Sequence, residues 1–202
     1  MVGYLERLGI TQIELEQILA SSASLRGILV GYLAEVRLME TWFRDYPPKK
    51  YDDHDRKHKG DRWISYKGRE ISIEVKSLQS GSVEQIGDDQ WTGAVQIDAS
   101  DRRPVVLPNG DRLETVCLVV GGFDLVAVNL FEFGGKWRFA FARNCDLPRS
   151  TFRKYTPEQR QFLLQTTPKI TWPPQPPFRE EPFALMDAIV VEALLDEMAA
   201  ED

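Results

Sequence analysis

Two short runs of alternating residues, joined by Lys67-Gly68, constrain the fold of this chain more than any other feature. The first run covers residues 62–66 and the second covers residues 70–77. In the second run, aliphatic residues alternate with polar ones: Ile71, Ile73 and Val75 with Ser72, Glu74 and Lys76. A period of two is typical of a β-strand and puts Glu74 and Lys76 on one face. Glycine at the second loop position suits the positive φ of a tight turn, so the segment predicts a β-hairpin.

The register of this hairpin decides which side chains meet. A two-residue loop pairs Tyr66 with Arg69, and the same register places Asp61 directly opposite Glu74, with Cβ atoms about 4.5–5.5 Å apart. Lysine fits the first loop position less well, so a bulged register is the alternative. Facing carboxylates repel each other, and a divalent cation relieves the repulsion because carboxylate oxygens are hard ligands suited to Mg²⁺. The pattern therefore predicts either a magnesium site or an exposed hairpin with a casual ion pair.

Lys76 lies one pleat beyond Glu74 on the same predicted face. An ammonium group there could orient or help to deprotonate an attacking water, and it could stabilise the charge that builds on a phosphate. A carboxylate pair, a divalent cation and a neighbouring lysine together favour hydrolysis of a phosphodiester.

A further carboxylate, Glu35, lies on a predicted helix that begins at the N-cap Ser24 and runs to about Phe43. The apolar positions of this helix recur at three- and four-residue steps and predict a core-facing stripe: Leu25, Ile28, Leu29, Tyr32, Val36, Met39 and Phe43. Glu35 lies at the edge of the stripe, an unusual place for an unpaired carboxylate. It is either part of the site, with Gly31 allowing a close approach one turn earlier, or a boundary residue in water.

The order Asp61, short hairpin, Glu74-x-Lys76 resembles the PD-(D/E)XK nuclease superfamily, the restriction-endonuclease-like proteins. Gly60 stands before Asp61 in place of the proline of the family motif. The resemblance implies that Asp61, Glu74 and Glu35 hold Mg²⁺, with Mn²⁺ as a substitute, and that Lys76 assists the attacking water. It implies DNA as the substrate, and it covers residues 31–77, less than a third of the chain.

The whole chain predicts an α/β fold, a restriction-endonuclease-like mixed central β-sheet flanked by helices, with N-terminal helices and a C-terminal helix. Thr11 and Glu14 predict a capping box for a helix to about Ala20, and Thr156-Pro157 opens a later helix. Apolar runs predict the remaining strands, at residues 94–99, 115–120, 124–133 and 137–142. Pro108-Asn109-Gly110 predicts a turn.

The domain organisation follows from the proline-rich stretch at residues 172–178. We expect residues 1–171 to form the nuclease-like domain, and residues 172–202 to form an extended segment followed by a helix from about Pro182 to Ala200. This acidic, amphipathic helix packs either on its own domain or on a partner. Residues 80–91 form either the helix that the family fold has after the hairpin, or a mobile loop near the site.

Charge indicates the class of partner. The net charge of −6 excludes a nucleic-acid coat that is basic all over, yet residues 44–69 contain nine Lys or Arg against five Asp. We expect DNA as the partner, contacted by five side chains: Lys57, Lys59, Arg62, Arg102 and Arg103. The basic stretch is alternatively a solvated loop, and Arg102-Arg103 a plain surface pair. Gln90 or Gln96 is a candidate for a glutamine that some family members use near the site.

Cys117 and Cys145 lie in apolar, strand-like segments, which predicts two buried thiols rather than a disulfide framework. A zinc site would have to combine them with His54 and His58, but the chain has no short cysteine pair. No apolar run is long enough to cross a bilayer and no leader begins the sequence, so we expect a cytoplasmic protein.

A binding role is the alternative to an enzyme. A non-catalytic nucleic-acid-binding or assembly module could keep the nuclease fold without cutting. The proline-rich stretch and the acidic C-terminal helix are also compatible with a partner or with a homodimer. The presence of all four expected residue types at the site favours the enzyme.

Overall fold

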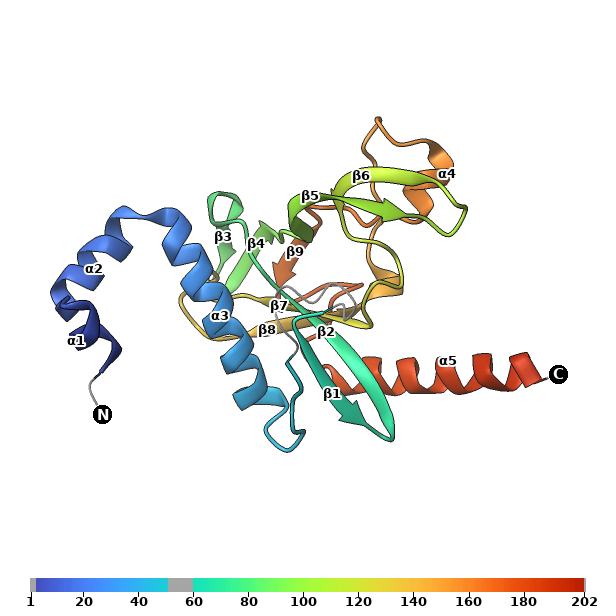
Figure 1. Ribbon diagram of the computed structural model, residues 1–202, viewed down its shortest axis with the longest axis horizontal. Coiled ribbons are helices and arrows are strands. Elements are labelled where there is room, and N and C mark those ends of the chain that lie inside the picture. The colour runs from blue at the N-terminus through green and yellow to red at the C-terminus, as the bar shows by residue number, and fades with distance from the viewer. Residues whose placement is uncertain (1–2, 51–59, 202) are drawn as a thin grey trace.

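The computed structural model describes residues 3–50 and 60–201 of the chain. Helices lead the described chain, strands follow, and a long helix ends it (Figure 1). The helices are α1 (Tyr4–Leu8), α2 (Gln12–Ser21), α3 (Ala23–Trp42), α4 (Pro157–Gln161) and α5 (Phe183–Glu201), with 3-10 turns η1 (Ser80–Ser82) and η2 (Asn144–Asp146). The strands are β1 (Arg62–Tyr66), β2 (Arg69–Ser77), β3 (Glu84–Gly87), β4 (Gln90–Ala94), β5 (Asp98–Val106), β6 (Arg112–Cys117), β7 (Leu125–Asn129), β8 (Phe139–Arg143) and β9 (Lys169–Trp172).

A four-stranded mixed sheet of order β1-β2-β7-β8 forms the centre of the molecule. Strands β2 and β7 run parallel, and the other neighbours are antiparallel. Tyr66 pairs with Arg69 and Arg62 with Ile73, so the predicted two-residue loop and its register are confirmed. Lys67 and Gly68 both have positive φ, 48° and 83°. Positive φ at both central residues defines the type I′ turn, whose twist matches that of the two strands.

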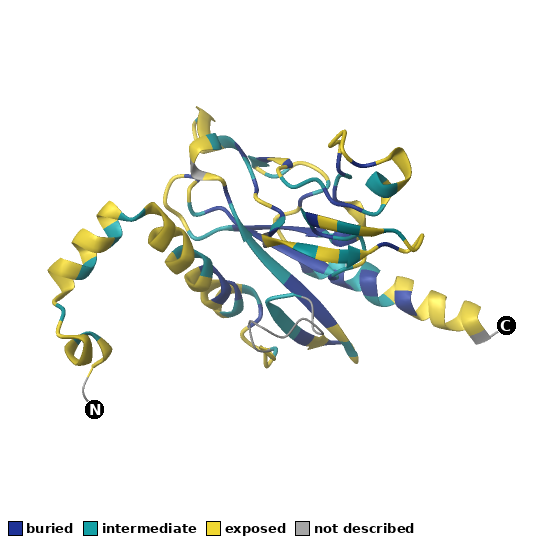
Figure 2. Ribbon diagram, turned by 45° about the horizontal axis from the view of Figure 1, so that its top comes forward, coloured by how far each residue is buried: buried dark blue, intermediate teal, exposed yellow. Residues whose placement is uncertain are grey.

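Each face of the central sheet has its own core (Figure 2). On the face that we call the helix face, α3 and α5 cover the sheet, through residues that include Ala34, Leu38, Met186, Ile73, Leu125 and Phe141. On the opposite face, which we call the strand face, the sheet packs against residues that include Val95, Ile97, Leu118, Phe133 and Ile170. Glu74 pairs with Val126 and Lys76 with Val128, both in the strand-face core, so Glu74 and Lys76 lie on the strand face.

Two smaller sheets contribute to the strand face, one of order β3-β4-β9 and one of β5 and β6. The expectation of a helix or a loop over residues 80–91 is therefore wrong: after η1 the chain forms the β3–β4 hairpin. Because β4 pairs with β9, far along the sequence, tertiary contacts decide this structure. The strand expected over residues 94–99 is divided between β4 and β5. The predicted turn at Pro108–Gly110 is confirmed, with Gly110 at φ 88°.

Helix starts follow their capping residues. Thr11 forms the capping box of α2, as predicted, and the predicted helix start at Thr156-Pro157 is confirmed by α4, where Thr156 forms a capping box with Gln159. The N-cap of α3 is Ser22 rather than Ser24, because the Ser22 Oγ accepts a hydrogen bond from the Leu25 N–H at 3.3 Å.

The predicted core stripe of α3 is wrong over most of its length. Five of its residues are exposed: Leu25, Ile28, Leu29, Tyr32 and Val36. Only the C-terminal half of α3 reaches the sheet, where Ala34, Leu38 and the following Phe43 are buried. Residues 3–33, which we call the N-terminal arm, extend away from the body of the molecule (Figures 1 and 2).

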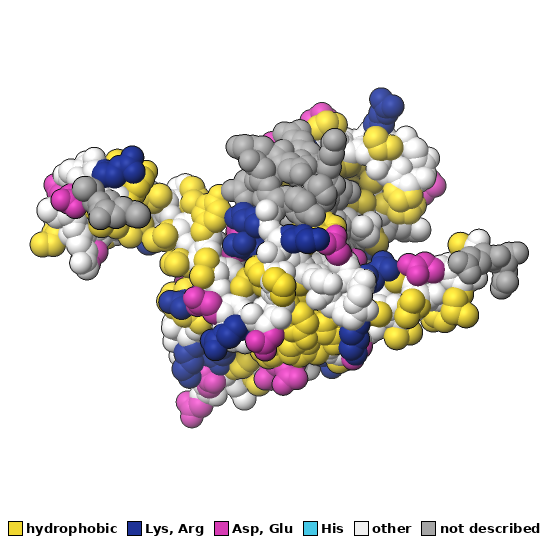
Figure 3. Space-filling model, turned by 60° about the horizontal axis from the view of Figure 1, so that its bottom comes forward, with side chains coloured by type: hydrophobic (Ala, Val, Ile, Leu, Met, Phe, Trp, Pro, Cys, Tyr) yellow, Lys and Arg dark blue, Asp and Glu magenta, His cyan; other side chains and the backbone are white. Residues whose placement is uncertain are grey.

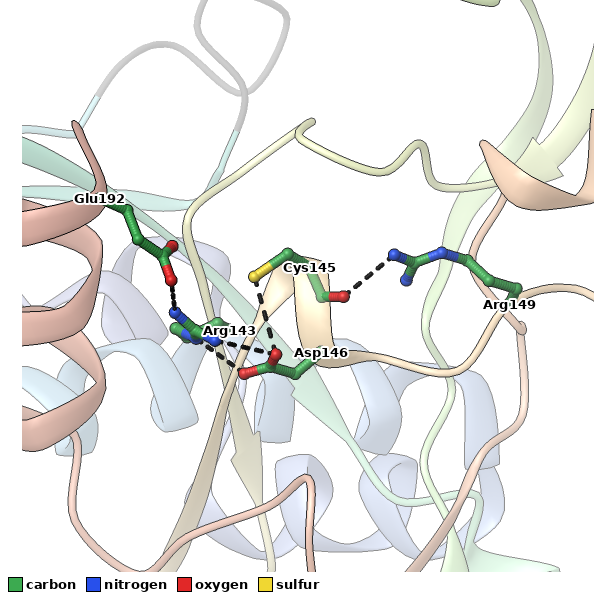
Figure 4. A network of polar contacts seen from close by, with 5 residues as sticks. All are labelled: Arg143, Cys145, Asp146, Arg149 and Glu192. Carbon is green, nitrogen blue, oxygen red and sulfur yellow. Dashed lines mark hydrogen bonds and ion pairs between the residues drawn. The ribbon is translucent and has the colours of Figure 1, made fainter. Parts of the chain in front are cut away.

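A polar network holds α5 beside the central sheet (Figure 4). Arg143, at the end of β8, donates hydrogen bonds to Asp146 and to Glu192 of α5. A cleft of about 810 Å³ opens here, lined by Arg143, Asp146, Pro176, Pro177, Arg179, Leu185, Ala188 and Glu192. Cys145 of η2 is exposed next to this network, so the prediction of a buried thiol is wrong for Cys145, whereas Cys117 is buried.

The C-terminal segment contributes to both cores. Phe178 lies in the strand-face core and Met186 in the helix-face core. The expected division into residues 1–171 and 172–202 stays a prediction. Within residues 3–50 and 60–201, no helix combines the length and the apolar character that crossing a membrane requires.

Candidate active site

Asp61 stands immediately before β1 and is fixed against β2 by two hydrogen bonds. Its N–H donates to the Ile73 carbonyl at 2.9 Å, and its Oδ2 accepts from the Val75 N–H at 2.7 Å. Gly60 has a φ of 98° and comes so close to β2 that a Cβ there would lie 3.3 Å from the Ile73 carbonyl oxygen. Glycine at position 60 therefore allows Asp61 its close approach to β2.

Glu74 and Lys76 reach the same place from β2. Lys76 Nζ lies 2.8 Å from Glu74 Oε1 and donates to the Asp98 carbonyl at 2.9 Å. The side chains of Lys76 and Glu74 are only 18% and 14% exposed. The structure thus brings Asp61, Glu74 and Lys76 together, as the hairpin register predicts.

The protonation of the site reflects its burial first and the neighbouring negative charge second. Burial, and next the charge of Glu74, raises the pKa of Asp61 to about 7, against the opposing effects of the Val75 N–H and Lys76. Burial also acts to lower the pKa of Lys76, but the charge and hydrogen bond of Glu74, with the charges of Asp61 and Asp98, outweigh burial and raise that pKa. Lys76 is therefore an ammonium at neutral pH, and Asp61 is near the midpoint of its titration.

Glu35 is buried beside the site but belongs to the helix face. Its Oε2 lies 3.1 Å from Arg62 Nη2 and 3.0 Å from Lys50 Nζ. Arg62 pairs with Ile73, a helix-face residue, so the Arg62 side chain points to that face. The charge of Glu35 is the smallest of the named contributions to the raised pKa of Asp61. Glu35 is thus a buried, ion-paired residue near Asp61 rather than a boundary residue in water.

The carboxylate pair fits a divalent cation that has two protein ligands. Mg²⁺ is commonly held by one or two carboxylates, with waters and substrate phosphate oxygens completing its coordination. Asp61 and Glu74 supply such a pair, and the charge of Glu74 helps to raise the pKa of Asp61 even though Lys76 lies 2.8 Å from Glu74. In the part of the chain that the structure describes, no group of three or more His, Cys, Asp or Glu side chains could hold a metal ion. Glu35 is therefore not placed as a third ligand.

Two residues that support the site carry no sequence motif. The Asp124 carboxylate accepts hydrogen bonds from the Ser72 N–H at 2.8 Å and the Ser72 hydroxyl at 2.7 Å, which ties the start of β7 to β2. Asp98 opens β5 and provides the carbonyl that receives Lys76. Only the tertiary fold brings Asp98 to Lys76, so nothing in the local sequence predicts this contact.

The basic residues expected to contact DNA have different surroundings. Arg102 is exposed and Arg103 partly buried on β5, the strand that Asp98 opens. The Arg62 side chain is 15% exposed and engaged by Glu35. Lys57 and Lys59 lie outside the described residues, as do His54 and His58 of the zinc alternative.

The two candidate glutamines are also placed differently. Gln96 donates its amide N–H to the Ser77 carbonyl at 3.2 Å, and its side chain donates to Asp98 Oδ2 at 3.3 Å. Gln96 therefore lies beside the hydrogen bond from Lys76 to the Asp98 carbonyl. Gln90 lies at the turn of the β3–β4 hairpin, next to Gly87.

Comparison with known proteins adds little to this geometry. No family model and no curated protein sequence matches the chain. Among solved structures, the chain is similar to the bacterial homing endonuclease I-Ssp6803I, at 16% identity over 71% of this chain and 89% of that chain, with a TM-score of 0.35. At that TM-score the likeness carries no argument about function, which therefore depends on the site itself.

Proposed function

We propose that this chain is a Mg²⁺-dependent endonuclease of the PD-(D/E)XK type that hydrolyses DNA phosphodiester bonds. The supporting observation is that the Asp61 carboxylate, held on the Val75 N–H, lies close enough to Glu74 for the charge of Glu74 to raise its pKa, with the Lys76 ammonium 2.8 Å from Glu74. A purely structural hairpin gains nothing from this arrangement, because like charges opposed on one face are destabilising. Groups whose pKa is strongly raised by burial and by a specific charge partner are candidates for function.

The proposed roles follow from the geometry. Asp61 and Glu74 would hold the cation, which when bound supplies Lewis-acid activation of the scissile phosphate. Lys76 remains protonated at neutral pH, so its role is electrostatic rather than that of a general base. It donates hydrogen bonds, at Nζ, to the attacking water or to a phosphoryl oxygen as negative charge develops.

DNA as the substrate follows from the family resemblance and is compatible with the local charge. Arg102 is exposed on the strand that Asp98 opens beside Lys76. Lys50 and Arg62 lie on the helix-face side of Asp61, where they neutralise Glu35. Phosphate contacts of this kind give affinity that falls with salt concentration and carry no sequence preference.

A non-catalytic binding module is the second candidate. The observation that favours it is the engagement of Glu35 by two cations, which leaves the described site with a pair of facing carboxylates and no third. Such a module would bind DNA without cutting it, and substitutions in the carboxylate pair would leave DNA affinity unchanged or stronger.

A cleavage assay on supercoiled, linear and branched DNA, with and without Mg²⁺, separates the two candidates. The nuclease proposal expects Mg²⁺-dependent nicking or cutting that is lost in Glu74→Gln and in Lys76→Ala. Lys136→Ala is a matched control, because the Lys136 side chain is 66% exposed and pairs only weakly with Asp89 at 3.7 Å. Equal cleavage by wild type and Lys76→Ala would remove the proposed site from the reaction. DNA binding without cleavage in Mg²⁺ or Mn²⁺ would establish the binding module instead.

A further inference from the structure

The N-terminal arm exposes apolar side chains on nearly every turn and has no buried residue (Figure 2). The exposed ones are Tyr4, Leu8, Ile13, Ile18, Leu25, Ile28, Leu29, Tyr32, whose ring lies under Lys50 Nζ, and Leu33. Helices α1 and α2 have five and ten residues. Isolated helices shorter than about 12–15 residues are marginal in water, and helices in proteins gain most of their stability by packing an apolar face. Residues 3–50 and 60–201 leave these apolar side chains of the arm exposed, so a partner surface would stabilise the arm.

Helix α3 shows where that partner surface lies. Successive helical residues turn by about 100°, so Ala34 and Leu38, which contact the sheet, lie on one side of α3. Leu25, Leu29 and Val36 lie on roughly the opposite side, and they are 37%, 42% and 45% exposed. Their steps of four and seven residues keep them in one line, which is the spacing of a seam that a second helix fills.

We propose that this seam is the interface between two copies of the chain, paired antiparallel through α3 around a two-fold axis near Leu33. This pairing places Leu29 of one copy against Val36 of the other. It also places Arg26, which donates to the Leu19 and Ala20 carbonyls, beside Glu40 of the second copy, which is paired with Arg37 of its own chain, so opposite charges flank the seam on one side. A patch that is complementary to itself in this way is what a two-fold dimer requires.

The size of the apolar surface agrees with a dimer. The exposed apolar residues of the arm, with Val36, present roughly 1,000 Å² per copy if a fully exposed residue of this kind is taken as about 200 Å², and about half of that area is on α3, so α1 and α2 must also contribute to the interface. A stable interface buries about 800 Å² per partner, and the largest apolar patch of a typical monomer is about 300–600 Å². Figure 3 shows hydrophobic side chains on the visible face of the protruding arm.

Charge excludes two other occupants of the seam. The arm contains three Glu against two Arg, so it has no positive surface for a nucleic acid. The end of α5 also exposes apolar residues, including Leu194, Leu195 and Met198. However, α5 carries Glu192, Asp196 and Glu197 there, so both the arm and the end of α5 have a negative net charge. Pairing the arm with α5 is therefore less favourable than pairing two arms, in which Arg26 meets Glu40.

Analytical ultracentrifugation over a range of concentrations tests the interface without any reference to nuclease activity. Wild type should sediment as a dimer, and Leu29→Lys should weaken the dimer at least 100-fold while keeping the same thermal unfolding signal from the sheet. Leu195→Lys and Ile86→Lys are the controls, because both residues are exposed apolar ones outside the arm, at 59% and 57%. A monomeric wild type at 100 µM, or a dimer lost equally in Leu195→Lys, overturns the proposal.

Cysteine crosslinking tests the antiparallel geometry. In a Cys145→Ser background, which removes the exposed native thiol, oxidation of an equal mixture of Leu29→Cys and Val36→Cys proteins should give a crosslinked heterodimer. Each variant alone should crosslink poorly. Efficient crosslinking of Leu29→Cys with itself would indicate a parallel arrangement and would reject the proposed axis. The absence of any crosslink would reject α3 as the seam.

Discussion

The Asp61 carboxylate accepts a hydrogen bond from the Val75 N–H at 2.7 Å, which fixes it against the backbone of the residue that separates Glu74 from Lys76 in β2. The same position removes Asp61 from water and exposes it to the charge of Glu74, so its pKa rises to about 7. The hydrogen bond from the Val75 N–H favours the ionised carboxylate, whereas burial and the charge of Glu74 disfavour it. The balance between them makes the stability of the metal-free protein depend on pH in a specific direction.

Asp61→Asn should stabilise the metal-free protein above pH 7. An aspartate whose pKa is raised by folding favours the folded state most when it is protonated. Its contribution is therefore intact below about pH 4, falls as pH rises from about 4 to about 7, and stays constant above that. The rise of the Asp61 pKa from 3.8 to about 7 sets an upper value of about 4 kcal/mol for the unfolding free energy that Asp61→Asn gains. Urea unfolding of both proteins between pH 4 and pH 8.5, in the presence of a chelator, measures it.

Asp88→Asn is the matched control for this measurement. Asp88 lies exposed in the turn of the β3–β4 hairpin, so its carboxylate is solvated in the folded and the unfolded chain. We expect its free energy of unfolding to follow that of wild type at every pH. If the free energy of unfolding of Asp61→Asn also follows that of wild type at every pH, the ionised Asp61 does not destabilise the fold. The proposal that a cation binds this carboxylate pair then loses its physical basis.

Binding of Mg²⁺ should release protons near neutral pH. Because the pKa of Asp61 is about 7, this carboxyl is about half protonated at pH 7, and a cation binds only its ionised form. We expect about half a proton released per site at pH 7 and almost none at pH 9. Titration calorimetry in two buffers of different ionisation enthalpy gives the number directly. Binding by wild type with no proton release at pH 7 would contradict the assignment of Asp61 as a ligand.

Lys76→Met should separate metal affinity from cleavage. The Lys76 ammonium contacts Glu74 at 2.8 Å, so it competes with any cation for that carboxylate. Methionine keeps the apolar stem and removes the charge, which should strengthen Mg²⁺ binding several-fold and reduce DNA cleavage at least 100-fold. Calorimetry and a single-turnover cleavage assay provide the two numbers. A parallel loss of both would mean that Lys76 only supports the fold.

The local part of the site could be predicted from the sequence, because it depends on neighbouring residues. A period of two in residues 70–77 and the Lys67-Gly68 turn determine the register, and the register brings Asp61 to Glu74. The contact of Lys76 with the Asp98 carbonyl could not be predicted, because it needs the path of the chain through β3 and β4. The same dependence explains the wrong expectation for residues 80–91, where pairing with β9 decides the structure.

The error in α3 has a different cause. Periodicity places Leu25, Leu29 and Val36 on one line of the helix, but it does not say what covers that line, and all three residues are exposed rather than in the core. The sheet contacts the other side of the helix, through Ala34 and Leu38. Glu35 lies near this contact and meets Arg62, so a position predicted at the edge of the core proved to be a buried ion pair.

Arg62→Met should cost about 3 kcal/mol of unfolding free energy, because it leaves a carboxylate of 11% exposure with only part of its compensation. Adding Glu35→Gln to Arg62→Met should cost little more unfolding free energy, because the ion pair is already lost. The coupling in the double-mutant cycle should therefore equal the cost of Glu35→Gln alone, about 2 kcal/mol. The surface pair Arg69–Glu197, whose side chains are 40% and 69% exposed at 3.7 Å, should give less than about 1 kcal/mol in the same cycle.

The same variants decide whether Glu35 ever becomes a metal ligand. Loss of Arg62 releases one of the two cations that hold Glu35 away from the Asp61–Glu74 pair. If Glu35 can then join the site, Arg62→Met should bind Mg²⁺ more tightly than wild type, and adding Glu35→Gln should remove that gain. If Glu35 acts only as an ion-pair partner on the helix face, Glu35→Gln should leave Mg²⁺ affinity unchanged in the Arg62→Met background, because the two-carboxylate site does not include it.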